Sequence, residues 1–171
     1  MDICDVCGFD FEVVGRDDVG PRVTTAVESI AALLTDEPKV CLVRPSEQRW
    51  SMLEYGAHVR DVLLTLRDRL VIGLVEDDPG FKPLYRDERI DLGLYSDDTL
   101  AAVAAELGAA TSMFVRLFDA IEPELLSRSV QYGSPNPQPR TLLWMGLQAI
   151  HESEHHLTDI RENLQQVKRT D

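Results

Sequence analysis

Four long segments with apolar side chains at helical spacing constrain the fold of this chain more than any other feature. In the first of them, Val23, Val27 and Ile30 recur every three or four positions. Such spacing places the apolar side chains along one face of a helix, where a neighbouring helix can cover them. The segments span roughly residues 21–36, 51–75, 97–121 and 141–168. Because almost no stretch alternates as a strand does, the sequence predicts an all-α four-helix bundle.

Residues that start helices set the expected boundaries. Pro21 follows a glycine and suits the first turn of helix one. Ser51, with Glu54 three positions later, forms a capping box that opens helix two. Either Ser96 or Asp97 is expected to cap helix three.

The remaining segments are connections of different character. Residues 80–95 form a long connection, which is typical of a crossover between helices two and three when these are not neighbours. Residues 127–139 are polar and rich in proline, which predicts a short hairpin or a lid. Residues 1–19 are expected to form an N-terminal arm, followed by one bundle domain over residues 20–168.

The charge balance limits the expected partners. The 171 residues carry a formal net charge of −13, whereas nucleic-acid and anionic-membrane surfaces need clustered lysine and arginine. We find no apolar stretch of about 20 residues and no basic, apolar leader at the acidic N-terminus. We therefore expect a cytoplasmic protein with a small-molecule substrate and no nucleic-acid or membrane partner.

The three cysteines, Cys4, Cys7 and Cys41, do not make a disulfide framework in that compartment. Cys4 and Cys7 resemble half of a zinc knuckle, but a structural zinc site needs four ligands and no second cysteine pair is present. Cys41 would add a third ligand only if its loop folded back onto the N-terminus. The favoured interpretation is reduced cysteines in an arm that packs across the bundle.

The histidines carry the strongest functional signal, because three of the four fall within six positions of the last predicted helix. His151 and His155 are four residues apart, so their side chains lie one above the other, about 5–6 Å apart at Cβ. His58, near the start of helix two, is the histidine that could complete a metal site with them. His156 points about 100° away from His155 and is interpreted as a packing residue or a support for the ligands.

Two interpretations of the histidine pair stay open. Histidines four residues apart on a helix often flank a polar surface, and the spacing alone is a weak motif. All three predicted ligands can nevertheless face the bundle interior near one end, where they would leave coordination positions open to water or substrate. Three ligands and an opening are typical of a catalytic site, because a structural site is normally closed by a fourth protein ligand.

Two motifs then carry a family resemblance. The segment that leads to His58 is WSMLEYGAHVRD, and the block that begins at His151 is HESEHHLTDI. Their order and spacing resemble the DinB-like superfamily of four-helix metal-binding proteins, whose Trp-Ser-x-x-Glu-x-x-x-His signature supplies the first metal ligand. The resemblance covers roughly residues 20–165. It implies a bundle with a long crossover after the second helix and a divalent metal, commonly zinc or nickel, at His58, His151 and His155.

The resemblance also suggests a chemistry. Relatives include mycothiol-dependent maleylpyruvate isomerase and other enzymes that are thought to place a low-molecular-weight thiol on the metal. A divalent ion lowers the pKa of such a thiol, so that the thiolate can attack an electrophile. The middle ligand of the isomerase is a glutamate, where this sequence is expected to use His151. We therefore expect a thiol-dependent S-transferase or a hydrolase rather than that particular isomerase.

A non-enzymatic function is the alternative. The bundle could bind a metal and act as a stress-response or interaction module, for instance as a homodimer. Exposed apolar side chains such as Phe114 or Phe118 would favour such an interface.

Further side chains are expected beside the metal. Asp61, Glu152 or Glu154 could accept hydrogen bonds from the ligating imidazoles, although each also suits a solvated helix face. Arg60 or Arg140 could bind an anionic substrate, again with a surface position as the alternative. The expected pocket walls are the 80–95 connection and Trp50, Tyr55 or Trp144.

Overall fold

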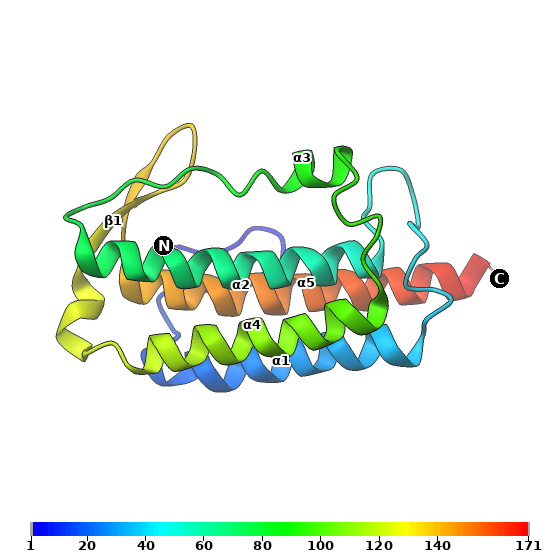
Figure 1. Cartoon of the computed structure of the whole chain (residues 1–171), viewed down its shortest axis with the longest axis horizontal. Helices are drawn as coiled ribbons and strands as arrows, with labels where there is room; N and C mark the ends of the chain where they lie inside the picture. Colours follow the sequence, from blue (N-terminus) through cyan, green and yellow to red (C-terminus); the bar gives the residue numbers. More distant parts are fainter. Residues whose placement is uncertain (1, 171) are drawn as a thin grey trace.

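The computed structural model describes residues 2–170, and four long helices form its body (Figure 1). The fold therefore confirms the predicted all-α four-helix bundle, with a small two-stranded sheet added at one end. In chain order the elements are α1 (Arg16–Asp36), α2 (Met52–Val75), α3 (Arg86–Asp91), α4 (Leu100–Asp119), the 3₁₀ helix η1 (Pro123–Ser127), β1 (Ser129–Tyr132), β2 (Gln138–Thr141) and α5 (Leu142–Thr170).

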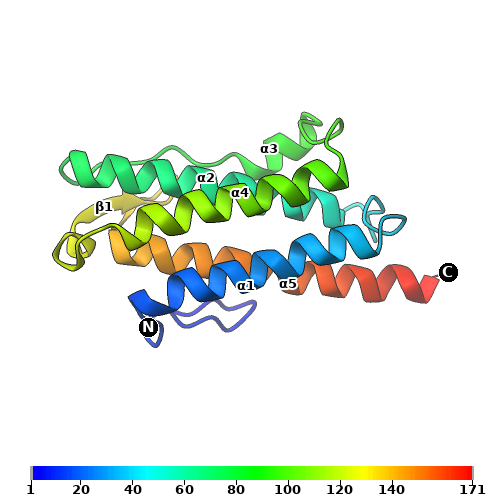
Figure 2. The same cartoon turned by 60° about the horizontal axis from the view of Figure 1, so that its bottom comes forward.

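The order of the helices in space differs from their order in the chain. Helix α1 packs against α4 and α5, and α2 packs against the same two helices, so α1 and α2 lie on one diagonal of the bundle. The chain returns from the end of α2 to the start of α4 through a crossover that runs along the outside of α2 (Figures 1 and 2). As a result α4 runs parallel to α2 and α5 runs parallel to α1. The long crossover predicted from the sequence is confirmed, but the helices that it joins, α2 and α4, pack against each other, so the expectation that they are not neighbours is wrong.

The first helix begins about one turn earlier than predicted. The backbone N–H of Gly15 donates to Asp18 Oδ2 at 2.8 Å, and α1 starts at Arg16. Pro21 therefore lies inside the helix and not at its first turn. Acidic side chains in the first turn, which favour a helix N-terminus, explain the earlier start.

The predicted N-terminal cap is correct for α2 and wrong for α4. At the start of α2, Ser51 Oγ accepts from the Glu54 N–H at 3.2 Å, and Glu54 Oε2 accepts from the Ser51 N–H at 2.7 Å. The predicted capping box is confirmed. The predicted cap of α4 is wrong, because Thr99 and not Ser96 or Asp97 accepts from the helix, with 3.2 Å between Thr99 Oγ1 and the N of Ala102.

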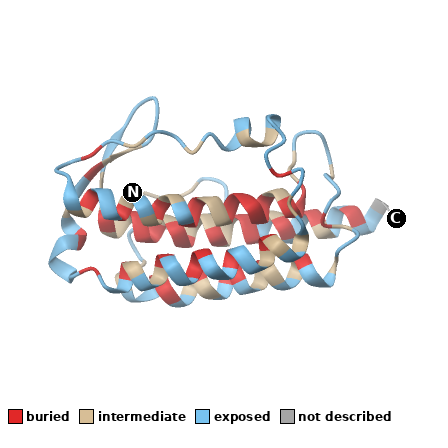
Figure 3. Cartoon of the chain, in the orientation of Figure 1, coloured by how far each residue is buried: buried red, intermediate tan, exposed pale blue. Residues whose placement is uncertain are grey.

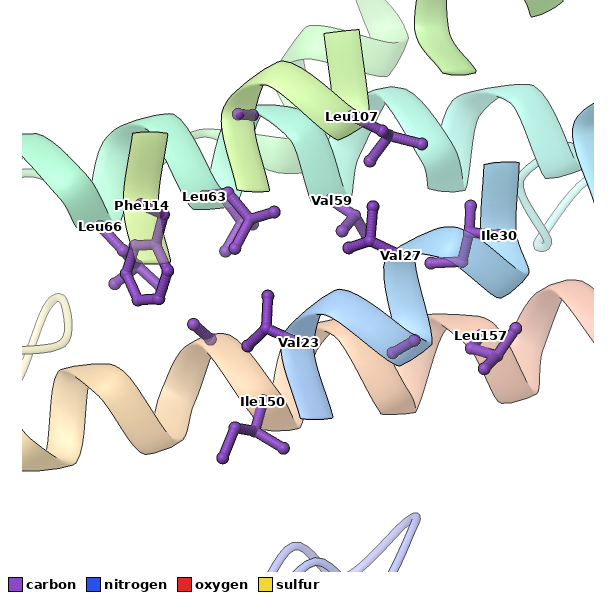
Figure 4. Close-up of a cluster of buried hydrophobic side chains, with 14 of the residues drawn as sticks. Val23, Val27, Ile30, Val59, Leu63, Leu66, Leu107, Phe114, Ile150 and Leu157 are labelled. Carbon is purple, nitrogen blue, oxygen red and sulfur yellow. The ribbon is translucent and has the colours of Figure 1, made fainter. Parts of the chain in front are cut away.

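Apolar side chains from all four long helices meet along the bundle axis, where buried residues line the inner faces and exposed residues the outer ones (Figures 3 and 4). Phe114 and Phe118 are fully buried there, so the interface that their exposure would have supported has no basis in this fold. The central cluster includes Val23, Val27, Ile30, Val59, Leu63, Leu66, Leu107, Phe114, Ile150 and Leu157.

Helix α4 corrects the expectation that the chain has no apolar stretch of membrane-spanning length. An 18-residue window of α4 reaches a mean hydropathy of 1.4, which by length and composition alone would suffice to cross a membrane. In this fold, however, α4 packs against α1 and α2 and places Val103, Leu107 and Phe114 in the core. The buried apolar side chains of α4 therefore belong to the core of the bundle.

The connections hold two small elements that position the site. Strands β1 and β2 pair antiparallel from Ser129 opposite Thr141 to Tyr132 opposite Gln138, which confirms the predicted hairpin. The Gln131 N–H donates to the carbonyl of Pro79 at 2.9 Å and joins the hairpin to the crossover. The short helix α3 in the crossover was not predicted.

Candidate metal centre

Three potential ligands converge between α2 and α5. The Nε2 atom of His58 lies 3.5 Å from Glu152 Oε2, and His156 Nε2 lies 3.4 Å from the same oxygen. One ligand atom from each residue falls within 4.8 Å of the others, which is close enough for all three to bind one ion. Two imidazole nitrogens and a carboxylate oxygen are a donor set that suits a divalent transition metal.

The helices place these side chains for simple geometric reasons. His58 lies two turns after the capped start of α2 and is buried, with 2% of its surface exposed. Glu152 and His156 are four residues apart on α5 and therefore occupy successive turns of one face. His156 belongs to the buried row of α5 that also contains Ser153 and Ile160. The face of α5 that packs against α2 thus carries both of its ligands into the interior.

The electrostatics of the cluster fit a cation. Neither ring nitrogen of His58 has a hydrogen-bond partner, and burial lowers the pKa of this histidine, which favours the neutral imidazole with one nitrogen able to coordinate. Burial opposes the ionisation of Glu152, but its contacts with His156 and His58 outweigh that effect and lower the pKa of the carboxyl. Burial also opposes a charge on His156, whereas Asp159 and Glu152 raise its pKa. A carboxylate held among imidazoles is an arrangement that suits a divalent ion.

The structure does not bring the predicted ligand trio together. His58 meets Glu152 and His156, whereas His151 and His155 face the N-terminal arm on another side of α5. Glu152, expected to support the ligands, lies in the cluster of potential ligands, and so does His156, which the sequence indicated as a packing residue or a support for the ligands. The prediction chose the wrong pair because Glu152 and His156 each lie one residue after His151 and His155, and one residue step along a helix rotates the side-chain direction by about 100°. Ile160, four positions after His156 on the same row, is the apolar residue in the sequence that could have identified the inward face.

The three aromatic residues predicted as pocket walls pack against histidine rings or against the N-terminal arm instead. The ring of Trp50 lies 5.2 Å from the ring of His58, and that of Tyr55 lies 5.3 Å from His156, so both pack against ligand imidazoles. Trp144 instead stacks on Phe11 of the arm at 5.2 Å. None of the three predicted aromatic residues lines the cleft described below.

Asp61, expected to support His58, holds the crossover instead. Its carboxylate accepts from Arg89 Nη1 at 2.7 Å and from the Tyr95 hydroxyl at 2.9 Å. It also accepts from Arg60 Nε at 2.9 Å. Asp61 therefore fixes the position of the segment that forms one wall of the site.

The other predicted polar residues are engaged elsewhere. Glu154 accepts two hydrogen bonds from Arg22 of α1, at 2.8 and 2.7 Å. Arg60 is further paired with acidic residues of α4 and of the segment before it, and Arg140 lies 2.9 Å from Asp2. Neither arginine lines the cleft that His58 faces.

A cleft of about 390 Å³ opens beside the cluster, with His58 and Glu152 in its wall. Arg69 of α2 and Arg86 of α3 bring positive charge to this cleft, and Tyr85 and Tyr132 add aromatic surface. The remaining lining residues are Val62, Thr65, Leu66, Pro83, Leu84, Asp87, Glu88 and Ser134. The 80–95 connection is thus a wall of the pocket, as predicted, and the hairpin forms another part of it.

The family model of the DinB superfamily matches residues 22–160. This chain belongs to the DinB superfamily. The match confirms the resemblance found in the two sequence motifs. Among curated proteins, no sequence matches this chain significantly.

Two solved structures share the fold of this superfamily member. One is YfiT from Bacillus subtilis, described as a probable metal-dependent hydrolase with an unusual four-helix bundle topology. It has a TM-score of 0.74 and 16% identity, over 92% of this chain and 91% of that one. The other is a conserved protein from Enterococcus faecalis, with a TM-score of 0.64 and 16% identity, over 88% of this chain and 95% of that one. At this identity the likeness concerns the fold, and the His and Glu cluster supports a divalent metal in this chain.

Proposed function

We propose that this protein is a divalent-metal-dependent enzyme, a thiol-dependent S-transferase, with His58, Glu152 and His156 as its metal ligands. The main support for an enzyme site is that two of these ligands, His58 and Glu152, also line the cleft. A divalent ion at this position would lower the pKa of a coordinated thiol and supply a thiolate near neutral pH. Three protein ligands leave room for such an exchangeable group.

The middle ligand supports a thiol-dependent reaction through the family resemblance. The two sequence motifs resemble those of mycothiol-dependent maleylpyruvate isomerase. The middle metal ligand of that relative is a glutamate. The sequence alone suggested that this chain departs from that pattern at His151. In the structure Glu152 lies between His58 and His156 and restores a carboxylate to the set.

The residues around the cleft support a small polar substrate. Arg69 and Arg86 offer guanidinium groups that can bind an anionic group of the thiol or of the electrophile. The side chain of Arg69 is oriented by the rings of Phe81 and Tyr132, at 5.2 and 5.3 Å. Asp61 holds the crossover in place through Arg89, so that the wall carrying Arg86 stays over the cleft.

A metal-dependent hydrolase is the second candidate. The observation in its favour is the shared fold with YfiT, described as a probable metal-dependent hydrolase. In that case water would replace the thiol in the same cleft. The burial of Phe114 and Phe118 removes the exposed patch that the non-enzymatic alternative was expected to show at these two residues. Zinc or nickel is the proposed metal, since imidazole and carboxylate accept both.

The test compares two neighbouring carboxylates on α5. We expect Glu152→Gln to lose one equivalent of metal and at least about a hundredfold in kcat/KM, because several kcal/mol of Lewis-acid stabilisation is removed. Glu154→Gln is the matched control, since Glu154 pairs with Arg22 on α1 and should change neither quantity. Metal content comes from elemental analysis of protein purified without chelator or nickel resin. Activity is measured with low-molecular-weight thiols plus electrophiles and, separately, with ester and amide substrates.

The outcomes separate the candidates. Thiol-dependent turnover that Glu152→Gln abolishes supports the S-transferase, and thiol-independent hydrolysis with the same dependence supports the hydrolase. If Glu152→Gln keeps the metal and the activity of the control, the three-ligand site is refuted.

A further inference from the structure

A second group of ligands lies outside the cleft, between the N-terminal arm and α5. Cys4, Cys7, His151 and His155 each offer one ligand atom, and these atoms all fall within 4.8 Å of one another. We propose that these four residues bind a structural zinc ion. This site is independent of the proposed function, because it shares no ligand with His58, Glu152 and His156.

The chemistry of the ligands favours zinc. Two thiolates and two imidazoles form the tetrahedral set of structural zinc sites, which four protein ligands close against solvent. The spacing Cys-x-x-Cys supplies one half of the set and the i, i+4 histidine pair supplies the other. The missing second half of the zinc knuckle is therefore a turn of helix and not another cysteine pair.

The backbone around the cysteines has the shape that such a site needs. The Cys4 N–H donates to the Phe9 carbonyl at 2.9 Å, and the Gly8 N–H donates to the Cys4 carbonyl at 2.8 Å. Gly8 has a φ of +71°, which glycine adopts without strain and which turns the chain back after Cys7. This tight loop presents both sulfur atoms on one side.

Contacts that involve no metal hold the arm over the histidines. The rings of Phe9 and Phe11 each lie 5.5 Å from the ring of His151. Asp2 accepts from Trp144 Nε1 at 2.7 Å and so fastens the start of the arm to α5. The arm in Figure 2 accordingly lies along the side of α5 and α1. These contacts hold the cysteines near the histidines without the help of a metal ion.

The imidazoles have the free nitrogen atoms that coordination requires. Both ring nitrogens of His151 and the Nδ1 atom of His155 are buried and have no hydrogen-bond partner. Buried polar atoms are nearly always hydrogen-bonded, so three such atoms at one place indicate a missing ligand. The other nitrogen of His155, Nε2, lies 3.6 Å from Asp159 Oδ2, the kind of carboxylate that orients a metal-bound imidazole.

The two sites alternate along one stretch of α5. His151 and His155 face the arm, while Glu152 and His156, each one residue later, face α2. Asp159 contacts a histidine of each site, since its Oδ2 atom lies 2.9 Å from His156 Nδ1. Zinc bound to the arm would therefore stiffen the same helical turns that present the catalytic ligands.

Cobalt substitution tests the proposal on the whole chain. Reduced protein without metal is titrated with Co²⁺, because a thiolate bound to cobalt gives a charge-transfer absorption in the near ultraviolet. We expect this absorption in the wild type and in His58→Ala, and its loss in the double variant Cys4→Ser, Cys7→Ser. Elemental analysis of zinc-loaded protein should give two equivalents for the wild type and one for either variant.

Two results would overturn the proposal. The first is a wild-type cobalt protein without thiolate absorption, a reading that needs no variant to fold. The second is an unchanged zinc content in the cysteine variant. Loss of the cleft metal in His58→Ala with the thiolate absorption retained bears only on the proposed enzyme site, so the two proposals fail separately.

Discussion

Gly146 on α5 provides a quantitative test of the packing that holds the ligand-bearing helix. Phe118 reaches from α4 to this glycine, although α4 and α5 lie on a diagonal of the bundle. A Cβ atom at position 146 would lie 2.3 Å from Cε2 and 2.5 Å from Cζ of Phe118. Since carbon atoms pack at about 3.5–4.0 Å, the ring would have to move by more than about 1 Å. Phe118 is fully buried, so its ring cannot move out into solvent without opening the core.

The free energy of unfolding should fall in the variant Gly146→Ala. Overpacking of a core costs about 1–3 kcal/mol, and the size of this overlap indicates the upper half of that range. Alanine returns about 1 kcal/mol through its higher helix propensity. The expected net loss is about 1–2 kcal/mol, or a decrease in Tm of about 2–8 °C for a chain of this length.

Gly108→Ala on α4 is the matched control. Gly108 is exposed, and an added Cβ there meets nothing within 4 Å. This variant should therefore gain about 0.5–1 kcal/mol from helix propensity alone. Urea unfolding of both variants measures the difference, and Phe118→Leu in the Gly146→Ala background should recover part of the loss. The reasoning is refuted if Gly146→Ala is as stable as Gly108→Ala.

Two further predictions concern a buried thiol and a partly buried carboxylate. Burial raises the pKa of Cys41 from 9.0 to about 11, so the unfolded chain ionises first and stability falls as pH rises from about 9 to about 11. Urea unfolding should show a loss of about 2 kcal/mol over that window, and Cys41→Ser should lack it; equal slopes in both proteins would contradict the assignment. Asp61→Asn should cost about 1–3 kcal/mol and speed amide hydrogen exchange at residues 84–95, because Arg89 loses its partner. Asp68→Asn, an exposed control, should do neither, and unchanged exchange in Asp61→Asn would show that Asp61 does not hold the crossover.

Much of the fold follows from local sequence signals. The apolar spacing of each long helix and the capping box of Ser51 and Glu54 are properties of a few neighbouring residues, and the structure confirms both. The errors arose where two local signals competed. Pro21 suits a helix start, but the acidic residues before it extend α1 by a further turn. Thr99 caps α4 in place of two nearby candidates of similar propensity.

The candidate site, like the fold, was predicted in part from local sequence signals and in part depended on packing. The sequence by itself determined that His58 lies near the start of α2 and that histidines and glutamates follow one another on the last helix at i, i+4 spacing. It could not determine which of two interleaved pairs faces α2, because each residue step turns the side chain by about 100° and only packing fixes the rotation of a helix. The tertiary structure placed Glu152 and His156 against His58. It also placed His151 and His155 beside Cys4 and Cys7 of the N-terminal arm, which lies about 140 residues earlier in the chain.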